Sequence, residues 1–190
     1  MTHLQLNEYQ CQALAKLSIE ALTPMQEAAL QAAREKSEVI LLSPTGTGKT
    51  LAYLLPLIER LRQGAACVQI ESVMKTMNLP WKAMSVYGGR AAMDEHRTMK
   101  GLQPTVIIGT PGRLNDHLAK GNIDATTIGV LVIDEFDKCL ELGFQDEMRE
   151  VIDKLPAVRH RYLISATDMD ELPDFTAMRR AVKLNYLAAT

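Results

Sequence analysis

Two short groups of residues have the chemical types needed to bind and cleave a phosphate chain. Residues 46–50 combine glycines with Lys49 and Thr50, and a second group contains Asp134 and Glu135. Glycines let main-chain N–H groups approach phosphates, the lysine can reach the terminal phosphates, and the threonine hydroxyl can ligate Mg²⁺. The first carboxylate can hold Mg²⁺ or its waters, and the second can orient or deprotonate an attacking water.

The glycine-rich group lies in a segment with the order strand, loop, helix. Residues 39–42 are all apolar and predict a buried strand, while apolar residues recur at helical spacing over residues 51–61. Inward N–H groups and the partial positive charge of a helix start favour a polyphosphate at such a turn. The general pattern has glycine at its first position, where this chain has Ser43. The alternative is a turn that only caps a helix, with Lys49 in solvent. The expected loop consists of Ser43, Pro44, Thr45, Gly46, Thr47, Gly48, Lys49 and Thr50.

The acidic group follows residues 130–133, an apolar run that predicts another buried strand. In a parallel sheet, ligands bind at the carboxyl ends of the strands. Asp134 would then lie opposite Lys49 and Thr50, and Glu135 would face another way. The alternative interpretation is a solvated acidic loop.

Three further apolar runs end in polar or glycine-containing groups. We expect these groups at the same edge as the phosphate loop, because strands buried on both faces indicate a parallel sheet. Arginines beside a glycine turn and a helix start suit a nucleic-acid phosphate backbone, although Thr110 and Pro111 alone could simply begin a helix. Ser165 and Thr167 alone are typical of a satisfied strand end. The three groups are Gly88, Gly89 and Arg90; Thr110, Pro111, Gly112 and Arg113; and Ser165, Ala166 and Thr167.

A segment near the N-terminus has two interpretations. Thr23, Pro24 and Gln26 have the spacing of a capping box at a helix start. The Gln26 amide both donates and accepts hydrogen bonds, so it could instead read the edge of adenine.

Composition limits the remaining possibilities. With 190 residues, the chain is expected to form one domain with a substantial core. A net charge of −2 gives no bulk attraction to nucleic acid or anionic lipid, so any nucleic-acid contact must be local. Cys11, Cys67 and Cys139 are far apart and odd in number, which fits neither a disulfide framework nor a zinc site. The apolar runs are short and no signal peptide is recognisable, so we expect a soluble, cytoplasmic chain without a membrane partner.

Together these segments resemble the N-terminal RecA-like domain of a DEAD-box ATP-dependent RNA helicase. The likeness extends over essentially the whole chain, and six motifs occur in the family's order. It implies an α/β, three-layer P-loop NTPase fold of the RecA-like type, with a mostly parallel sheet and helices on both faces. We expect one domain over residues 1–190, with residues 1–30 as a lead-in and no second RecA-like domain in this sequence. The motifs are the Q motif at residues 23–26, motif I at 43–50, the GG turn at 88–89, motif Ib at 110–113, motif II at 134–137 and motif III at 165–167.

The resemblance also implies ligands and roles. ATP with Mg²⁺ would be the nucleotide, RNA would be held by its backbone, and the parent protein's second RecA-like domain would be a partner. Gln26 would read adenine, and Arg113 and the glycine turn would touch RNA. Asp137, with Ser165 and Thr167, would couple nucleotide state to domain closure. Because the family's arginine finger lies on the second domain, we expect this chain alone to bind nucleotide but to hydrolyse it slowly and unwind nothing.

The sequence departs from the family at several points. Phe136 replaces the alanine of motif II, Leu22 and Ser18 differ from the Q-motif pattern, and the upstream stacking aromatic would fall at Met1. Motif Ia is not found, and residues 66–71 resemble what normally follows it. Helical spacing predicts a helix over residues 70–77, so a strand and its loop would be missing between residues 62 and 66.

Two functions from other classes fit parts of the pattern. A non-helicase P-loop ATPase or DNA translocase would share motifs I and II. A non-catalytic RNA-binding scaffold would need only the RNA motifs and would tolerate Glu135→Gln.

Overall fold

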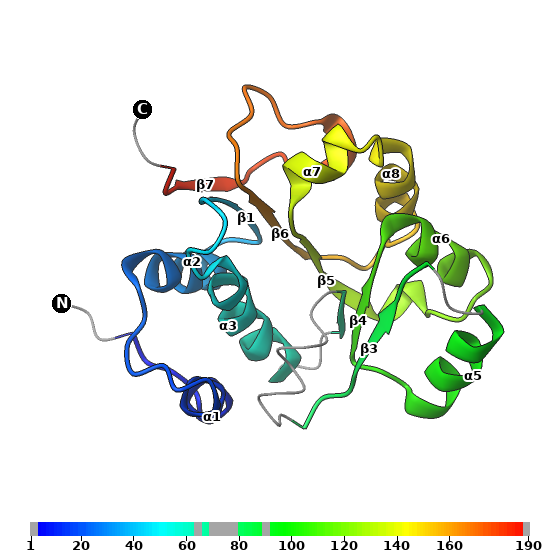
Figure 1. The fold of residues 1–190 in the computed structure, drawn as a ribbon, viewed down its shortest axis with the longest axis horizontal. Coiled ribbons are helices and arrows are strands. Elements are labelled where there is room, and N and C mark those ends of the chain that lie inside the picture. Colours follow the sequence, from blue (N-terminus) through cyan, green and yellow to red (C-terminus); the bar gives the residue numbers. More distant parts are fainter. Residues whose placement is uncertain (1–3, 63–65, 69–79, 89–91, 188–190) are drawn as a thin grey trace.

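The structure is a computed structural model that describes residues 4–62, 66–68, 80–88 and 92–187. Its seven strands form one sheet in the order β3-β4-β2-β5-β6-β1-β7 (Figure 1). The strands are β1 (Glu38–Leu42), β2 (Ala66–Val68), β3 (Ala83–Val86), β4 (Val106–Gly109), β5 (Ile128–Ile133), β6 (His160–Ser165) and β7 (Val182–Asn185).

Two helices precede β1, and helices also join β1 to β2, β3 to β4, β4 to β5 and β5 to β6. Among the described residues none of these helices is long and apolar enough to cross a membrane. They are α1 (Glu8–Lys16), α2 (Pro24–Glu35), α3 (Lys49–Arg62), α5 (Ala92–Leu102), α6 (Pro111–Ala119), α7 (Phe136–Glu141) and α8 (Gln145–Asp153), with short 3-10 helices at Ala125–Thr127 and Asp174–Thr176.

All described strand pairs are parallel, so the strands end at one common edge of the sheet. The register pairs Leu42, the last residue of β1, with Ser165 at the end of β6. It also pairs Ile133, the last residue of β5, with Leu163. The expectation that the polar groups after these strands share the edge of the phosphate loop is therefore confirmed for the described groups.

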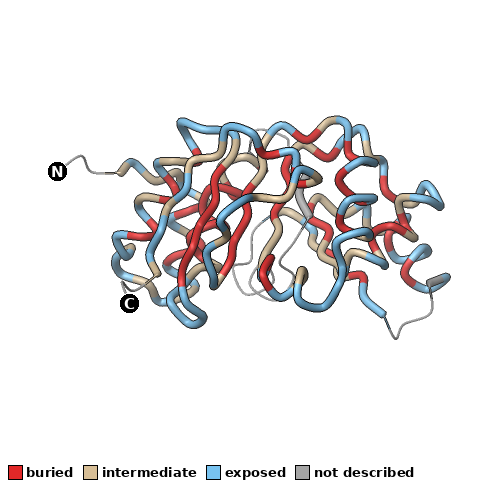
Figure 2. Tube along the Cα trace, turned by 90° about the horizontal axis from the view of Figure 1, so that it is seen from above, coloured by how far each residue is buried: buried red, intermediate tan, exposed pale blue. Residues whose placement is uncertain are grey.

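Alternate residues of the strands pack against helices on opposite faces of the sheet. Val39 and Leu41 of β1 join the core formed with α1, α2 and α3. Ile40 and Leu42 face the other way, toward Phe136 of α7. Helices α5, α6 and α8 extend the cover on that second side, over β3, β4 and β5. Figure 2 shows the buried strands between more exposed helices, which is the predicted three-layer α/β arrangement.

The N-terminal lead-in packs on α3. Asn7 and Gln10 form a capping box at the start of α1. The fully buried Gln10 amide also donates to the Leu55 carbonyl oxygen at 2.9 Å, which joins α1 to the helix that follows the phosphate loop. The Tyr9 and Trp81 rings meet edge to face, with centroids 5.0 Å apart, so Trp81 has a packing role here.

One expectation about the central sheet is wrong. The stretch after residue 65 was expected to lie beyond a missing strand, whereas Ala66–Val68 itself forms β2 between β4 and β5. The physical reason is that the central position of a parallel sheet must be filled to satisfy the inner ladders of its neighbours. Residues 63–65 and the helix expected over 70–77 lie outside the described residues.

Candidate nucleotide and nucleic-acid site

The glycine-rich loop leaves β1 and enters α3 at Lys49. Gly46 and Gly48 have φ of +84° and +89°, a region that glycine enters at little cost. Thr47 donates to the Pro44 carbonyl at 2.8 Å, so the 2.6 Å contact between the Ser43 and Thr47 hydroxyls must be donated by Ser43. This brace gives Ser43 a use that a glycine would lack. The first N–H groups of α3 have no acceptor within the helix and are available to an anion.

The Q-motif residues form the predicted capping box and also touch the loop. The Thr23 N–H donates to Gln26 Oε1 at 2.9 Å, and the Gln26 N–H donates to Thr23 Oγ1 at 3.3 Å. The buried Gln26 side chain then donates from Nε2 to the Gly48 carbonyl at 3.3 Å. A Cβ on Gly48 would lie 2.8 Å from that Nε2, so only glycine leaves room for the contact. The cap and the phosphate loop therefore share one amide.

The acidic strand end lies beside the first turns of α3. Asp134 Oδ2 accepts from the Tyr53 hydroxyl at 3.0 Å, and its Oδ1 accepts from the Glu135 N–H at 2.8 Å. Tyr53 comes one helical turn after Thr50, and a turn rises about 5.4 Å. Asp134 is thus held on the same rim as the helix start that carries Lys49 and Thr50, through a tyrosine that the sequence pattern did not single out.

Glu135 has an unusual backbone conformation, and its side chain pairs with Lys138. Its φ of +51° is a left-handed conformation that is uncommon for residues other than glycine, and such strain gathers at functional sites. Its carboxylate accepts from Lys138 Nζ at 3.1 Å in an exposed pair, and this bond is the main reason that the pKa of Lys138 is raised.

The third acid of this group faces the end of β6. Asp137 is buried and accepts from the Thr167 hydroxyl at 3.3 Å, while its Oδ1 is buried without a hydrogen bond in the described part of the chain. Ser165 donates to the Thr167 carbonyl at 2.8 Å, and the Ser43 N–H donates to the Ser165 carbonyl at 3.1 Å. A chain of contacts therefore runs from the start of the phosphate loop to the acidic group.

The donor set at this edge suits Mg²⁺. A carboxylate with both oxygens oriented and a threonine hydroxyl are hard oxygen ligands, and Mg²⁺ completes its shell with waters and phosphate oxygens. No cluster of three or more acidic, histidine or cysteine side chains is found among the described residues.

The start of α6 is the described part of the candidate nucleic-acid surface. Thr110 is its N-cap, but its side chain makes no cap hydrogen bond, and a Cβ on Gly112 would meet nothing within 4 Å. Gly88 is likewise open, at the end of β3, whereas Gly89 and Arg90 lie outside the described residues. Open backbone and an unengaged hydroxyl at a helix start suit a phosphate.

A buried polar network that the sequence did not reveal lies directly beneath Arg113. Glu95 of α5 is 3% exposed, and its Oε2 accepts from Arg113 Nε at 2.7 Å and contacts His117 Nε2 at 2.9 Å. Burial alone would raise the pKa of Glu95, but hydrogen bonds from His117 and Arg113 and the arginine charge outweigh it and hold this pKa below its usual value. The only sequence signal was acidic and basic residues on two segments, which is too common to predict a pair.

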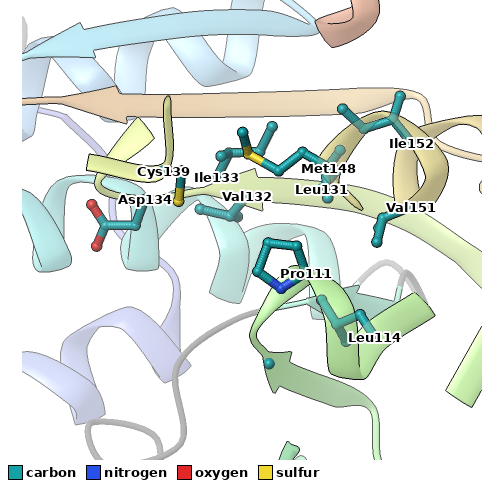
Figure 3. A pocket seen from close by; sticks show the side chains of 11 residues that line it. Pro111, Leu114, Leu131, Val132, Ile133, Asp134, Cys139, Met148, Val151 and Ile152 are labelled. Atoms are coloured by element: carbon teal, nitrogen blue, oxygen red, sulfur yellow. The ribbon is translucent and has the colours of Figure 1, made fainter. Parts of the chain in front are cut away.

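A small apolar cavity of about 70 Å³ lies between this surface and the acidic strand end (Figure 3). Pro111 and Leu114 of α6 line one side, and Asp134 and Cys139 line another. Burial, together with the nearby carboxylates, raises the pKa of the Cys139 thiol, so it stays protonated. The start of α6 and the end of β5 thus form opposite walls of one cavity.

A phosphate-binding loop and an acidic strand end on one edge of a parallel sheet define an α/β protein of the P-loop class. The chain belongs to the DEAD/DEAH box helicase family, since that family's model matches residues 23–175. The expected family and its RecA-like fold are therefore confirmed.

Relatives and solved structures agree with this assignment. The chain is 30% identical to the ATP-dependent RNA helicase CshA of Listeria monocytogenes over 88% of its length, and 33% identical to the DEAD-box helicase RhpA of Helicobacter pylori over 86%. It spans only 35% and 36% of those two proteins. A DEAD box protein from Methanococcus jannaschii matches with a TM-score of 0.84 at 21% identity, covering 97% of this chain and 55% of the other. Mss116p bound to ssRNA and AMP-PNP matches with a TM-score of 0.82 at 25% identity, covering 95% and 42%.

Proposed function

We propose that this chain is the ATP-binding domain of an ATP-dependent RNA helicase, which unwinds short RNA duplexes or remodels RNA–protein complexes in the full-length protein. The observation that carries the proposal is the placement of Asp134 beside α3, at the helix start formed by Lys49 and Thr50. The relatives' names support it, and so does the Mss116p complex with ssRNA and AMP-PNP. The cytoplasm is the proposed location, since both ATP and RNA are available there.

In the proposed mechanism the loop N–H groups and Lys49 bind the β- and γ-phosphates. Thr50 and Asp134 would hold Mg²⁺, which neutralises charge that develops on the phosphates. Glu135 would orient and deprotonate the attacking water, for which it would exchange its exposed pair with Lys138 for a bond to the water. Gln26 would bind adenine, and the contacts of Asp137, Ser165 and Thr167 would report nucleotide state to the second RecA-like domain.

RNA is proposed to bind at Gly88 and at the start of α6, at Thr110, Gly112 and Arg113; the proposed contacts of Gly89 and Arg90 lie outside the described residues. All of these groups suit phosphate and sugar rather than base edges, so the binding would not depend on sequence. This fits a net charge of −2, because a few placed donors replace a basic surface.

The test is ATP binding and hydrolysis by this chain and by the full-length parent protein, each with and without single-stranded RNA. Lys49→Ala should weaken nucleotide binding at least tenfold, whereas Glu135→Gln should retain binding and abolish hydrolysis in the parent. The isolated chain should hydrolyse ATP slowly, because an arginine finger supplied by a second domain is worth about 10³ to 10⁵ in rate.

Two outcomes would favour other functions. Stimulation of the parent protein by DNA in place of RNA would favour a DNA translocase or another P-loop ATPase. Full function of the parent with Glu135→Gln would favour a non-catalytic RNA-binding scaffold.

A further inference from the structure

The helices that begin at the two proposed RNA-binding groups are joined by a buried chain of polar side chains. Glu95 lies in the first turn of α5, and its Oε2 binds both Arg113 in the first turn of α6 and His117 one turn later. Asn122 Nδ2 lies 2.9 Å from His117 Nδ1. An amide N–H can only donate, so Nδ1 of His117 accepts from Asn122 and its Nε2 donates to Glu95. Glu95 is thus held by His117, which Asn122 holds in turn.

The burial of this network is informative. Glu95 is 3% exposed and His117 is fully buried, whereas the Arg113 side chain is 16% exposed and reaches the surface. A buried carboxylate is costly unless it is paired and hydrogen-bonded. Apolar residues of similar size would join α5 to α6 at least as well, so packing alone gives no reason for a carboxylate at this position.

The geometry of the arginine gives such a reason. A guanidinium is planar and presents its N–H donors in a rigid fork, so fixing Nε fixes the direction of the whole group. The 2.7 Å bond from Nε to Glu95 sets that plane, and Asp116 Oδ2 lies 3.9 Å from Nη1. The bond to Glu95 therefore constrains the direction of the guanidinium before any ligand arrives.

We propose that Glu95, held by His117 and Asn122, is a positioning residue for RNA binding: it orients the Arg113 guanidinium toward the RNA backbone. This inference rests on the proposed RNA site. It predicts that the Glu95 carboxylate strengthens RNA binding, whereas its negative charge alone would weaken binding by repelling the phosphates.

The experiment compares the Glu95→Gln variant with the unsubstituted chain. Gln keeps the size of the side chain but removes the charge that holds Nε. The affinity for a fluorescently labelled single-stranded oligo(U) RNA is measured by anisotropy, with AMP-PNP and Mg²⁺, over a series of salt concentrations. We expect about ten- to a hundredfold weaker binding, the effect of one lost charge-assisted contact, and a salt slope reduced by about 0.7, the value for one phosphate contact on a single strand.

Asp94→Asn is the matched control. It removes the same charge from the preceding residue of α5, which is exposed, and it should leave RNA affinity unchanged or slightly increase it. Arg113→Gln should weaken binding as Glu95→Gln does, and the double variant should be no weaker than the more affected single variant. Thermal midpoint and AMP-PNP affinity are measured for every variant, so that a loss of folding is distinguished from a loss of orientation.

The outcomes separate the inference from the proposed function. Unchanged or tighter RNA binding by Glu95→Gln, while Arg113→Gln binds weakly, overturns the positioning role and leaves the RNA site in place. Additive losses in the double variant overturn it as well. If the unsubstituted chain binds AMP-PNP but no RNA, the proposed RNA site itself is wrong. If Glu95→Gln fails to fold, Asn122→Ala, at the half-buried end of the network, replaces it. This variant should also bind RNA more weakly than the unsubstituted chain.

Discussion

Replacing Phe136 with alanine converts the acidic group to the sequence usual in the family and should destabilise this protein. The Phe136 ring is 0% exposed and packs with Ile40, Leu42 and Leu163 of the sheet. It also meets the Phe175 ring, with centroids 6.2 Å apart. Truncation of a buried phenylalanine costs about 3 to 5 kcal/mol, which includes the cavity that remains. Strands on one side of the ring cannot easily move into that space, so little relaxation is expected.

This cost is large enough to measure in two ways. For a domain of this length, 1 kcal/mol lowers the melting temperature by about 2 to 4 °C, so Phe136→Ala should lower it by about 6 to 20 °C. Urea unfolding followed by circular dichroism should show a lower midpoint with an unchanged slope. Phe144→Ala is the control, because that residue is 36% exposed, and it should cost only about 1 to 2 kcal/mol. If the free energy of unfolding of Phe136→Ala lay within about 1 kcal/mol of that of the unsubstituted chain, the packing argument would be refuted.

Three other changes test separate features of the molecule. Gly109→Ala should cost about 1 to 3 kcal/mol in urea unfolding, because a Cβ there would lie 2.6 Å from Val86 Cγ2; Gly101→Ala, where nothing lies within 4 Å, should cost nothing. Tyr53→Phe should raise the Mg²⁺ concentration needed for tight AMP-PNP binding by about tenfold, since it removes the hydrogen bond to the strand-end carboxylate; an unchanged Mg²⁺ requirement would contradict that role. Burial and two neighbouring arginines lower the pKa of His160 below the usual value for histidine, so the unfolded chain binds the proton more readily. Stability should therefore fall as the pH drops through about 6.5, and His160→Gln should reduce that loss in melting curves taken between pH 7.5 and 5.5.

Local sequence was sufficient to predict the parts of the site that are formed by residues close together along the chain. The phosphate loop is one such part, because Gly46 and Gly48 must adopt positive φ to begin α3 where Lys49 stands. The capping box at Thr23 and Gln26 is another, since its two bonds span three residues. Patterns of this kind can be read without knowing the fold.

Contacts between distant segments could not be predicted in the same way. The bond between Tyr53 and Asp134 joins residues 81 positions apart, and it depends on how α3 packs beside β5. Glu95 and His117 resemble ordinary polar residues of surface helices until the packing of α5 on α6 buries them. The strand at Ala66–Val68 was missed because three residues carry too little periodicity to identify.

The sharing of one amide between the Gln26 cap and the Gly48 carbonyl has a thermodynamic consequence. Without nucleotide this amide already bonds to two main-chain groups, one through Oε1 and one through Nε2. A side-chain amide has two N–H donors and two lone pairs on its oxygen, so it can still offer one of each to a base. A base that hydrogen-bonds to Gln26 would therefore leave the helix cap and the loop contact in place. Because both contacts fix the amide before nucleotide arrives, little side-chain entropy would be lost when the base binds.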